Sequence, residues 1–196
     1  MNLRWMRMLW VALMIVYLAM NSMAQETGTE NDREADHTAL RTLLKEAAEA
    51  LNNRELDKLT DCFTDNFVLT AVDQTVLTDR AAIKAYYEKM LCREDSPVSS
   101  FHVAPKAEIL TQFVDTNTGY CYGTSEDIYT VRKNGRQVTM ASRWTALVVK
   151  REGHWKIAAI HSGVNFLDNP VLTARTLPWW RKLFLAVGIG KYPGEK

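Results

Sequence analysis

A histidine stands in the stretch GHWKIAAIHSG, residues 153–163, where the alternation of apolar and polar residues would place an aliphatic side chain. An imidazole can act as a general acid or base near neutral pH, and a carboxylate within reach would orient its ring and raise its proton affinity. His161 is therefore the first candidate for acid–base chemistry. A structural role is the alternative, because a histidine that ends a strand can simply hydrogen-bond a neighbouring serine or main-chain group.

The dipeptide Asn134-Gly135 is the strongest short hairpin signal in the chain. A two-residue loop at this site would pair Lys133 with Arg136 and fix the register of both flanking strands. Counting outward from the loop, Asp127 then faces Ser142 across the hairpin.

A second two-residue loop is predicted at Glu152-Gly153, where it would pair Arg151 with His154. This register sets Trp144 opposite His161. One face of the predicted sheet then gathers the polar and aromatic candidates Ser125, Asp127, Tyr129, Ser142, Trp144 and His161. One extra residue in either turn, or a bulge, would exchange the two faces.

The sequence shows no sign of a metal, cofactor or nucleic-acid site, and no cofactor is expected. The four histidines have no carboxylate or cysteine at ligand spacing, and the chain lacks a phosphate loop and a nucleophile elbow. A formal charge of +1 creates no field for a polyanion. The three cysteines, Cys62, Cys92 and Cys121, allow at most one internal disulfide, and buried thiols are the alternative.

The elements that must position these residues begin with helices. Apolar stripes predict a helix at about Thr38–Asn52, a short second helix around Leu56, and a third over residues 80–91, capped by Thr78 or Asp79. Strands are predicted at Phe67–Thr70, Ser99–Gln112, Gly119–Arg132, Gln137–Lys150 and His154–Phe166. Helices followed by an antiparallel meander indicate the α+β class.

The order and spacing of these segments resemble the SnoaL-like branch of the nuclear transport factor 2-like superfamily. The matching stretches are FTDNFV at residues 63–68, DRAAI at 79–83 with Tyr86-Tyr87 after it, and the closing strand from GHWKI to His161-Ser162. The resemblance covers about Thr38 to Leu167. It implies an α+β cone, in which three N-terminal helices pack in the concave face of a curved, mostly antiparallel sheet and enclose a pocket.

The family includes ketosteroid isomerases, dehydratases and polyketide cyclases alongside members without enzyme activity, so the fold does not settle the function. By the resemblance, Ala71 stands where the isomerases keep their aspartate base. Asp73, two residues on and facing the same way, is a possible substitute. The resemblance also implies a homodimer formed through the outer face of the sheet.

The expected site has an acid–base part and a ligand-binding part. His161 and Asp127 are the candidate catalytic residues, and a partly exposed position near the rim is the alternative for Asp127. Trp144 would supply an apolar wall for a ring-containing or acyl ligand. The other candidate ligand-binding residues are Ser125, Ser142, Tyr129 and Tyr86, for the last of which a core position is the alternative. The expected partner is a small, largely apolar molecule.

The N-terminal part of the chain differs from the domain predicted over residues 38–168. Arg4 and Arg7 precede an apolar run at residues 8–20 that is shorter than a membrane span, which predicts a signal peptide over residues 1–24 and export to the periplasm or the extracellular space. An uncleaved anchor is the alternative. Residues 25–37 are polar and mostly acidic, as in a disordered linker.

The C-terminal tail, residues 169–196, carries aromatic and basic residues side by side. Trp179 and Trp180 stand next to Arg181 and Lys182 and before a short apolar stub. This combination predicts a peripheral contact with a membrane. Alternatively, the aromatic residues close a groove on the domain or on a dimer partner. A non-catalytic dimeric interaction module held near a membrane is accordingly the second functional hypothesis.

Overall fold

Residues 33–164 and 177–191 are described by a computed structural model of the chain. The predicted signal peptide, most of the acidic linker and residues 169–176 and 192–196 of the tail lie outside these ranges. The chain divides into two units, Met1–Ala39 and Leu40–Lys196. The candidate site lies in the second unit.

Helices begin the described chain. Residues 33–52 are helical, so this helix extends five residues beyond its predicted start at Thr38 and includes the end of the predicted linker. Glu34 and Ala35 are good helix formers, which accounts for the extension. The short helix α2 (Leu56–Asp61) and the helix α3 (Arg80–Tyr87) follow as predicted, and a π-helical turn, η1 (Glu88–Cys92), continues α3.

Asp79, one of the two capping residues that the sequence predicts, caps the N-terminus of α3. Its side chain accepts a hydrogen bond from the main-chain N–H of Ala82 at 2.7 Å. A capping carboxylate satisfies one of the free N–H groups of the first turn and interacts favourably with the helix dipole.

Eight strands form one sheet in the order β2-β1-β8-β7-β6-β3, and β4 and β5 also pair with β6. All pairs are antiparallel except β1 with β8. The strands are β1 (Phe63–Thr70), β2 (Val76–Leu77), β3 (Val98–His102), β4 (Pro105–Ala107), β5 (Gln112–Phe113), β6 (Thr118–Val131), β7 (Gln137–Arg151) and β8 (His154–Val164). The single strand predicted over Ser99–Gln112 is thus three short strands, all bonded to β6.

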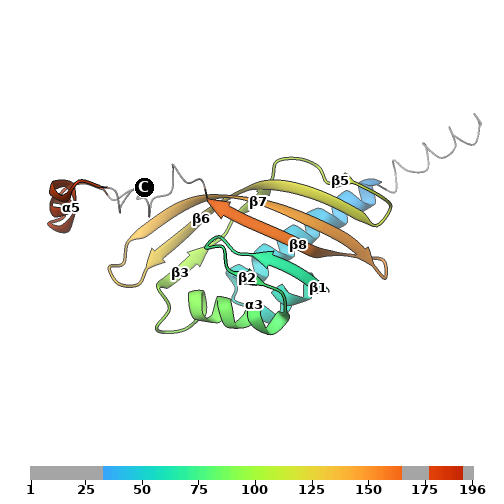
Figure 1. The fold of residues 1–196 in the computed structure, drawn as a ribbon, viewed down its shortest axis with the longest axis horizontal. Helices are drawn as coiled ribbons and strands as arrows, with labels where there is room; N and C mark the ends of the chain where they lie inside the picture. The colour runs from blue at the N-terminus through green and yellow to red at the C-terminus, as the bar shows by residue number, and fades with distance from the viewer. Residues whose placement is uncertain (1–32, 165–176, 192–196) are drawn as a thin grey trace, which may run out of the picture. The chain divides into compact units, whose positions relative to one another are not determined.

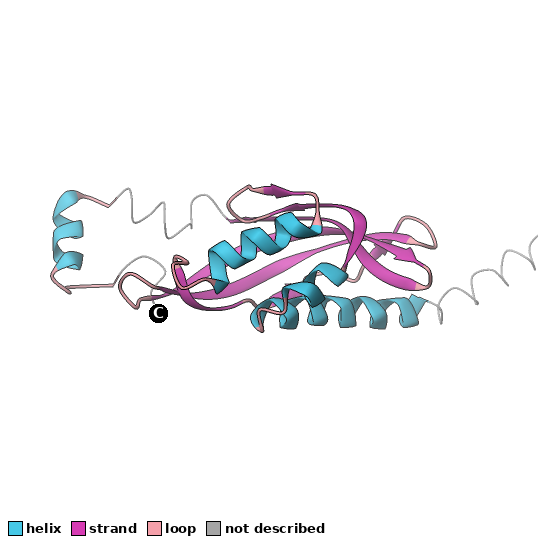
Figure 2. Cartoon of the chain, turned by 90° about the horizontal axis from the view of Figure 1, so that it is seen from below, coloured by secondary structure: helices cyan, strands magenta, loops and turns pink. Residues whose placement is uncertain are grey.

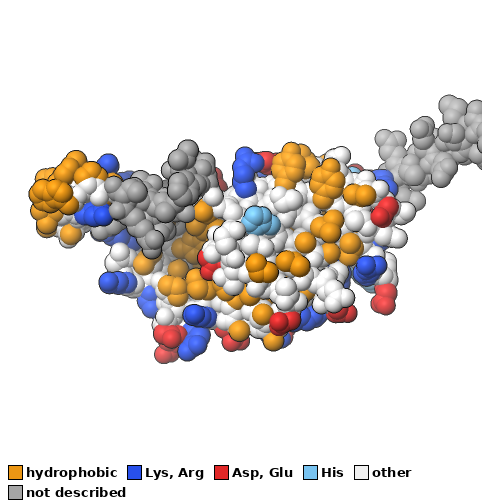
Figure 3. Space-filling view, viewed as in Figure 1, with side chains coloured by type: hydrophobic (Ala, Val, Ile, Leu, Met, Phe, Trp, Pro, Cys, Tyr) orange, Lys and Arg blue, Asp and Glu red, His pale blue; other side chains and the backbone are white. Residues whose placement is uncertain are grey.

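The sheet is curved, and the helices lie on one of its faces (Figures 1 and 2). The predicted α+β architecture, with helices in the concave face of a mostly antiparallel sheet, is confirmed. The other face, called the outer face below, carries hydrophobic side chains scattered among polar ones (Figure 3).

The core lies between the helices and the concave face of the sheet. Alternate residues of the strands reach it, because successive side chains of a strand point to opposite faces. The buried core side chains come from the first helix, α2 and α3, from β1, β2, β7 and β8, and from two positions next to α2 and β1: Leu40, Leu43, Ala50, Leu56, Leu59, Cys62, Phe63, Phe67, Leu69, Ala71, Leu77, Ile83, Val148, Trp155 and Ile157. Cys62, Cys92 and Cys121 are free thiols.

The loop of the hairpin between β6 and β7 is two residues longer than predicted. Val131 donates its main-chain N–H to the carbonyl of Arg136 at 2.7 Å, which leaves a four-residue loop that ends on Gly135 at φ 67°. Asp127 therefore faces Met140 rather than Ser142. A shift of two residues keeps every side chain on its predicted face, because the side-chain period of a strand is two.

The hairpin between β7 and β8 has the predicted two-residue loop, with φ 51° at Glu152 and 81° at Gly153. Its register then shifts at a bulge: Val148 pairs with Ile157, but Leu147 pairs with Ala159. The extra residue is Ala158. Every side chain of β8 beyond it lies on the face opposite to the predicted one.

A substitution at Gly123 in β6 tests how closely β4 and the indole of Trp144 pack against this strand. A Cβ atom at this glycine would overlap the main-chain oxygen of Lys106 and lie 2.6 Å from Cζ2 of Trp144. We expect Gly123→Ala to lower the free energy of unfolding by about 2 kcal/mol or more, as overpacking does. Urea denaturation followed by circular dichroism measures it.

The matched control is Gly163→Ala in β8, where an added Cβ meets no atom within 4 Å. This variant should change the free energy of unfolding by only about 0.5 kcal/mol, as surface substitutions do. Equal destabilisation by the two variants would contradict the close packing of β4 and Trp144 against β6.

Candidate functional site

A buried carboxylate marks the concave face of β6. The side chain of Asp127 is only 7% exposed. Its Oδ1 accepts a hydrogen bond from the Ser125 hydroxyl at 2.5 Å, and its Oδ2 accepts longer ones from the Tyr129 hydroxyl at 3.4 Å and the Ser142 hydroxyl at 3.5 Å. The main-chain N–H of Ala104 also bonds to this carboxylate. No ion pair joins Asp127 to a cationic side chain within the described ranges.

Strand periodicity explains this cluster. Ser125, Asp127 and Tyr129 occupy every second position of β6 and so share one face of the sheet. Ser142 is the cross-strand partner of Ser125, which places its hydroxyl diagonal to Asp127.

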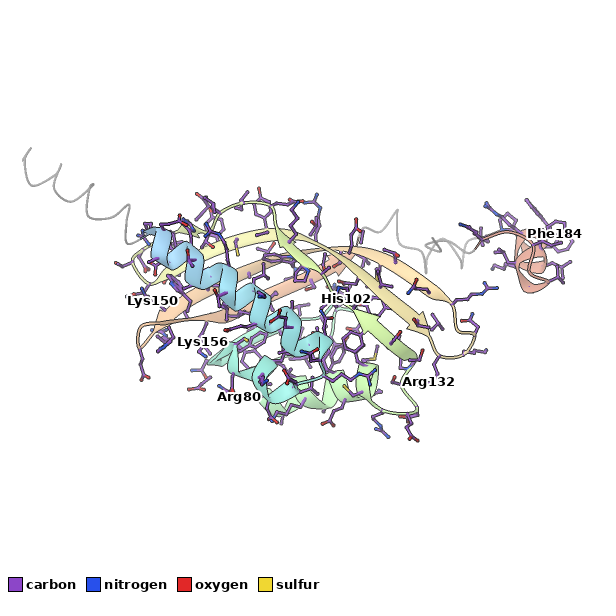
Figure 4. The ribbon with its side chains drawn as sticks, turned by 180° about the vertical axis from the view of Figure 1, so that it is seen from behind. Arg80, His102, Arg132, Lys150, Lys156 and Phe184 are labelled. Atoms are coloured by element: carbon purple, nitrogen blue, oxygen red, sulfur yellow. The ribbon has the colours of Figure 1, made fainter. Side chains whose placement is uncertain are left out.

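The concave side of β7 changes from apolar to polar along the strand. Its inward residues run Val148, Ala146, Trp144 and Ser142, all of them buried. The apolar end belongs to the core beneath the helices, and the polar end meets Asp127. Figure 4 shows this side of the sheet, with residues 40–52 of the first helix crossing in front of the strands.

The environment of Asp127 favours its protonated form. Burial raises the pKa of this carboxyl above its ordinary value of 3.8, and this outweighs the opposing effect of the hydrogen bonds from Ser125, Ala104, Tyr129 and Ser142. Desolvation penalises a charged group, and no cation offsets the penalty here. Asp127 can therefore exchange a proton at a higher pH than an exposed aspartate can.

Two tyrosines beside Asp127 stay protonated at neutral pH. Burial raises the pKa of Tyr129 well above its ordinary value, and the charge of Asp127 adds to this effect. Burial, followed by the charges of Asp127 and Asp73, raises the pKa of Tyr87 to about 12. Both phenols are therefore hydrogen-bond donors at neutral pH.

A second carboxylate lies in the middle of the β1–β2 turn, residues 71–75. Burial alone would raise the pKa of Asp73, but hydrogen bonds from the Thr75 main chain and hydroxyl and from the Tyr86 hydroxyl lower it overall. The ring of Tyr86 meets that of Tyr87 edge-on, with centroids 5.1 Å apart. Tyr86 thus contacts both the exposed Asp73 and Tyr87, whose pKa the charges of Asp127 and Asp73 raise.

Trp144 offers an apolar surface to this face. Its side chain is buried, and its indole N–H donates to the main-chain oxygen of Thr124 at 3.1 Å. Because its single donor is already used, the rest of the ring can make only apolar contacts. This agrees with the predicted side of the sheet for Trp144.

The predicted position of His161 is wrong. The bulge at Ala158 places His161 opposite Thr145 on the outer face, where it is exposed, while Trp144 faces Ser162. His161 and Trp144 thus lie on opposite sides of the sheet. Asp127 is neither a partner of His161 nor a partly exposed rim residue, because it is buried on the concave side.

Three of the other predicted residues remain together on the concave side, because Ser125, Ser142 and Tyr129 all contact Asp127. Tyr86 instead packs against the core, the alternative for this residue, and its hydroxyl bonds to Asp73. Sequence reasoning missed Tyr87 as a neighbour of Asp127. The signal was present, because Tyr87 follows the fully buried Ile83 by four residues and therefore shares its helix face.

The cluster can bind a donor group and move a proton, but it has no ligand set for a metal. Within residues 33–164 and 177–191, no three His, Cys, Asp or Glu side chains group as metal ligands. The groups available for chemistry are a carboxyl of raised pKa and the neutral hydroxyl donors beside it, next to the apolar surface of the Trp144 indole.

Known structures share this architecture at low sequence identity. A type 2 hexachlorocyclohexane dehydrochlorinase aligns with a TM-score of 0.62 and 14% identity over 70% of this chain and 90% of its own. A cystatin-like domain of unknown function from Nostoc punctiforme aligns at 0.56 and 18%, over 78% and 85%. An NTF-2 like protein of unknown function from Shewanella oneidensis aligns at 0.50 and 20%, over 64% and 97%.

These likenesses show the fold alone. A search of curated proteins found no match. Residues 32–161 match the SnoaL-like domain family, and this stretch contains both hairpins, the three helices and the Asp127 cluster. The chain therefore belongs to the SnoaL-like family.

Proposed function

We propose that the concave face of the sheet binds a small, largely apolar molecule that carries one hydrogen-bond donor, with Asp127 as the polar contact. The observation that carries the proposal is the buried Asp127 carboxylate, which is held by hydroxyl and amide donors and by no cation of the described part of the chain. A ligand hydroxyl or amine would stabilise the ionised carboxylate.

The geometry of the carboxylate supports this role. The hydroxyls of Tyr129 and Ser142 approach Oδ2 at 3.4 and 3.5 Å. These distances are longer than the roughly 2.5–3.0 Å that is usual for an O–H···O hydrogen bond. A ligand donor could make a shorter bond with the same oxygen. The indole of Trp144 would contact the apolar body of the ligand, as is common where a few polar groups orient a molecule in an apolar site.

The proposal also includes acid–base chemistry at Asp127. With its raised pKa, Asp127 could take a proton from a bound ligand, and the phenols of Tyr129 and Tyr87 could donate hydrogen bonds to the charge that develops. One protein of the same fold is named for its action on hexachlorocyclohexane, a small apolar molecule. His161 has no part in this proposal.

Export is part of the proposal as well. It rests on the predicted signal peptide at residues 1–24 and thus on the sequence alone.

Binding of 2-naphthol tests the role of Asp127, because this probe joins an apolar ring system to one hydroxyl donor. We expect 2-naphthol to bind the parent protein more tightly than naphthalene does. Asp127→Asn should lower the affinity for 2-naphthol by about tenfold or more, because it removes a charge-assisted hydrogen bond. Naphthalene should bind both proteins alike. Fluorescence titration of the purified protein measures all four constants.

The matched control is Glu126→Gln, which removes the same charge one residue away on the exposed face of β6. It should leave both probes unaffected. Equal affinity of 2-naphthol for the parent and for Asp127→Asn would refute the role proposed for this carboxylate.

The raised pKa of Asp127 also makes stability depend on pH. Because the folded pKa lies above the ordinary value of 3.8, the contribution of Asp127 is fully favourable below that pH and is lost as the pH rises through the folded pKa. The amide introduced by Asp127→Asn cannot ionise. We therefore expect this variant to gain thermal stability relative to the parent as the pH rises from 3.8 to neutral, measured by circular dichroism. If the difference in thermal stability between the two proteins stays constant or shrinks over this pH range, burial does not raise the pKa of Asp127.

A dimer through the outer face is the second candidate function, and one observation favours it. Val68, Ala159, Leu147 and Tyr120 are successive partners across β1, β8, β7 and β6. They form an outward row in which Val68, Leu147 and Tyr120 are exposed. In the next row His161 stands between Thr70 and Thr145. Exposed apolar rows of this kind are typical of interaction surfaces.

Sedimentation equilibrium tests the dimer. Leu147→Glu puts a charge in the centre of the apolar row, so we expect it to shift the protein to monomer. Val114→Glu is the matched control, because Val114 is an exposed apolar residue in the turn after β5, outside the row. A parent protein that stays monomeric at high concentration would contradict the proposed dimer.

A further inference from the structure

The helix α5 (Trp179–Ala186) collects its large apolar side chains on one side. At 100° per residue, Trp179, Leu183, Val187, Trp180 and Phe184 fall within an arc of about 140°. All five are exposed, and Trp179 is 77% exposed. Figure 3 shows the hydrophobic side chains covering this helix, and Figure 4 labels Phe184 on it.

The buried residue of α5 points the other way. Leu185, only 3% exposed, lies about 100° beyond Phe184, outside the apolar arc. The protein thus buries one leucine of this helix and leaves both tryptophans and the phenylalanine in contact with solvent. The rings of Trp180 and Phe184 pack edge-on at 6.2 Å, so the aromatic surface is ordered within the helix itself.

Charge around this apolar arc has one sign. Arg181 and Lys182 flank the arc on either side, and Lys191 follows the helix. Residues 177–191 contain no acidic residue, although the whole chain carries a formal charge of only +1. The tail therefore combines an exposed aromatic face with a local positive charge that the rest of the chain balances.

We propose that α5 binds the surface of a membrane that contains anionic lipids. Tryptophans favour the interfacial region, where the indole ring is partly apolar and its N–H stays hydrated, and basic residues at the edges of the helix would contact the headgroups. Attraction to anionic lipids accounts for the positive charge. This inference is independent of the ligand proposed for the concave face.

The length of α5 fixes how it would bind. Eight residues of helix extend about 12 Å, against about 30 Å for the apolar interior of a bilayer. Within the described part of the chain, no helix is long and apolar enough to cross a membrane. The helix would therefore lie in the plane of the interface, with the arc of Trp179 and Leu183 toward the acyl chains.

The experiment isolates the two tail indoles from the other four tryptophans of the chain. The emission of Trp179→Phe/Trp180→Phe is subtracted from that of the parent protein, each with vesicles of phosphatidylcholine and phosphatidylglycerol and without them. We expect the difference emission to shift to shorter wavelength with vesicles and to be quenched by brominated acyl chains. Because the signal comes from the tail, binding by the N-terminal apolar run cannot mimic it.

The charge requirement is tested with Arg181→Glu/Lys182→Glu, studied by the same subtraction. We expect its vesicle partitioning to fall at least about tenfold, as removal of two interfacial cations requires. Lys89→Glu/Lys106→Glu makes the same charge change at two exposed positions of the domain and should leave partitioning unchanged.

Three results would overturn the proposal. The difference emission could stay unchanged when vesicles are added. It could already be at short wavelength in buffer, which would mean that the aromatic face packs against protein. Or the two charge variants could partition equally, which would show that the positive charge of the tail has no special role.

Discussion

The candidate site depends on one unfavourable fact, the burial of a carboxylate without a cation. Asp127 is surrounded by hydroxyl and amide donors, which satisfy its oxygens only in part and leave its pKa raised. A carboxyl in such a place costs stability when it ionises, and proteins commonly accept that cost at sites that bind or react. The neighbouring phenols and the indole of Trp144 derive their proposed roles from this group.

Strand register decides which side chains share that environment. The long pairing of β6 with β7 brings Ser125, Asp127, Tyr129 and Ser142 to the concave face, and the bulge at Ala158 sends His161 to the other side. One inserted residue thus separates a histidine from a carboxylate that would otherwise share its face. The same bulge places His161 within the outward rows that we propose as a dimer surface.

Most of the fold and part of the site could be predicted from the sequence. Amphipathic stripes, the Asp79 cap and the Glu152-Gly153 turn act locally, so they can be read from short stretches of sequence. The loop between β6 and β7 has four residues instead of the predicted two. The prediction of which side chains share a face still holds, because a register shift of two residues leaves every side chain on the same face of the sheet. The bulge could not be predicted, since Ala158 and its neighbours fit a regular strand equally well; the register of β8 with β1 is irregular at the same place. Tyr87 could have been found from its place four residues after Ile83, on the same face of α3.

The desolvation of the Asp127 carboxyl is open to direct measurement. An NMR titration follows the Asp127 side-chain carbon in the intact protein, with Asp127→Asn to assign the signal. We expect a titration midpoint above the ordinary 3.8. A midpoint at or below that value would mean that the surrounding donors fully stabilise the anion, and the proposed role of Asp127 would then lose its physical basis.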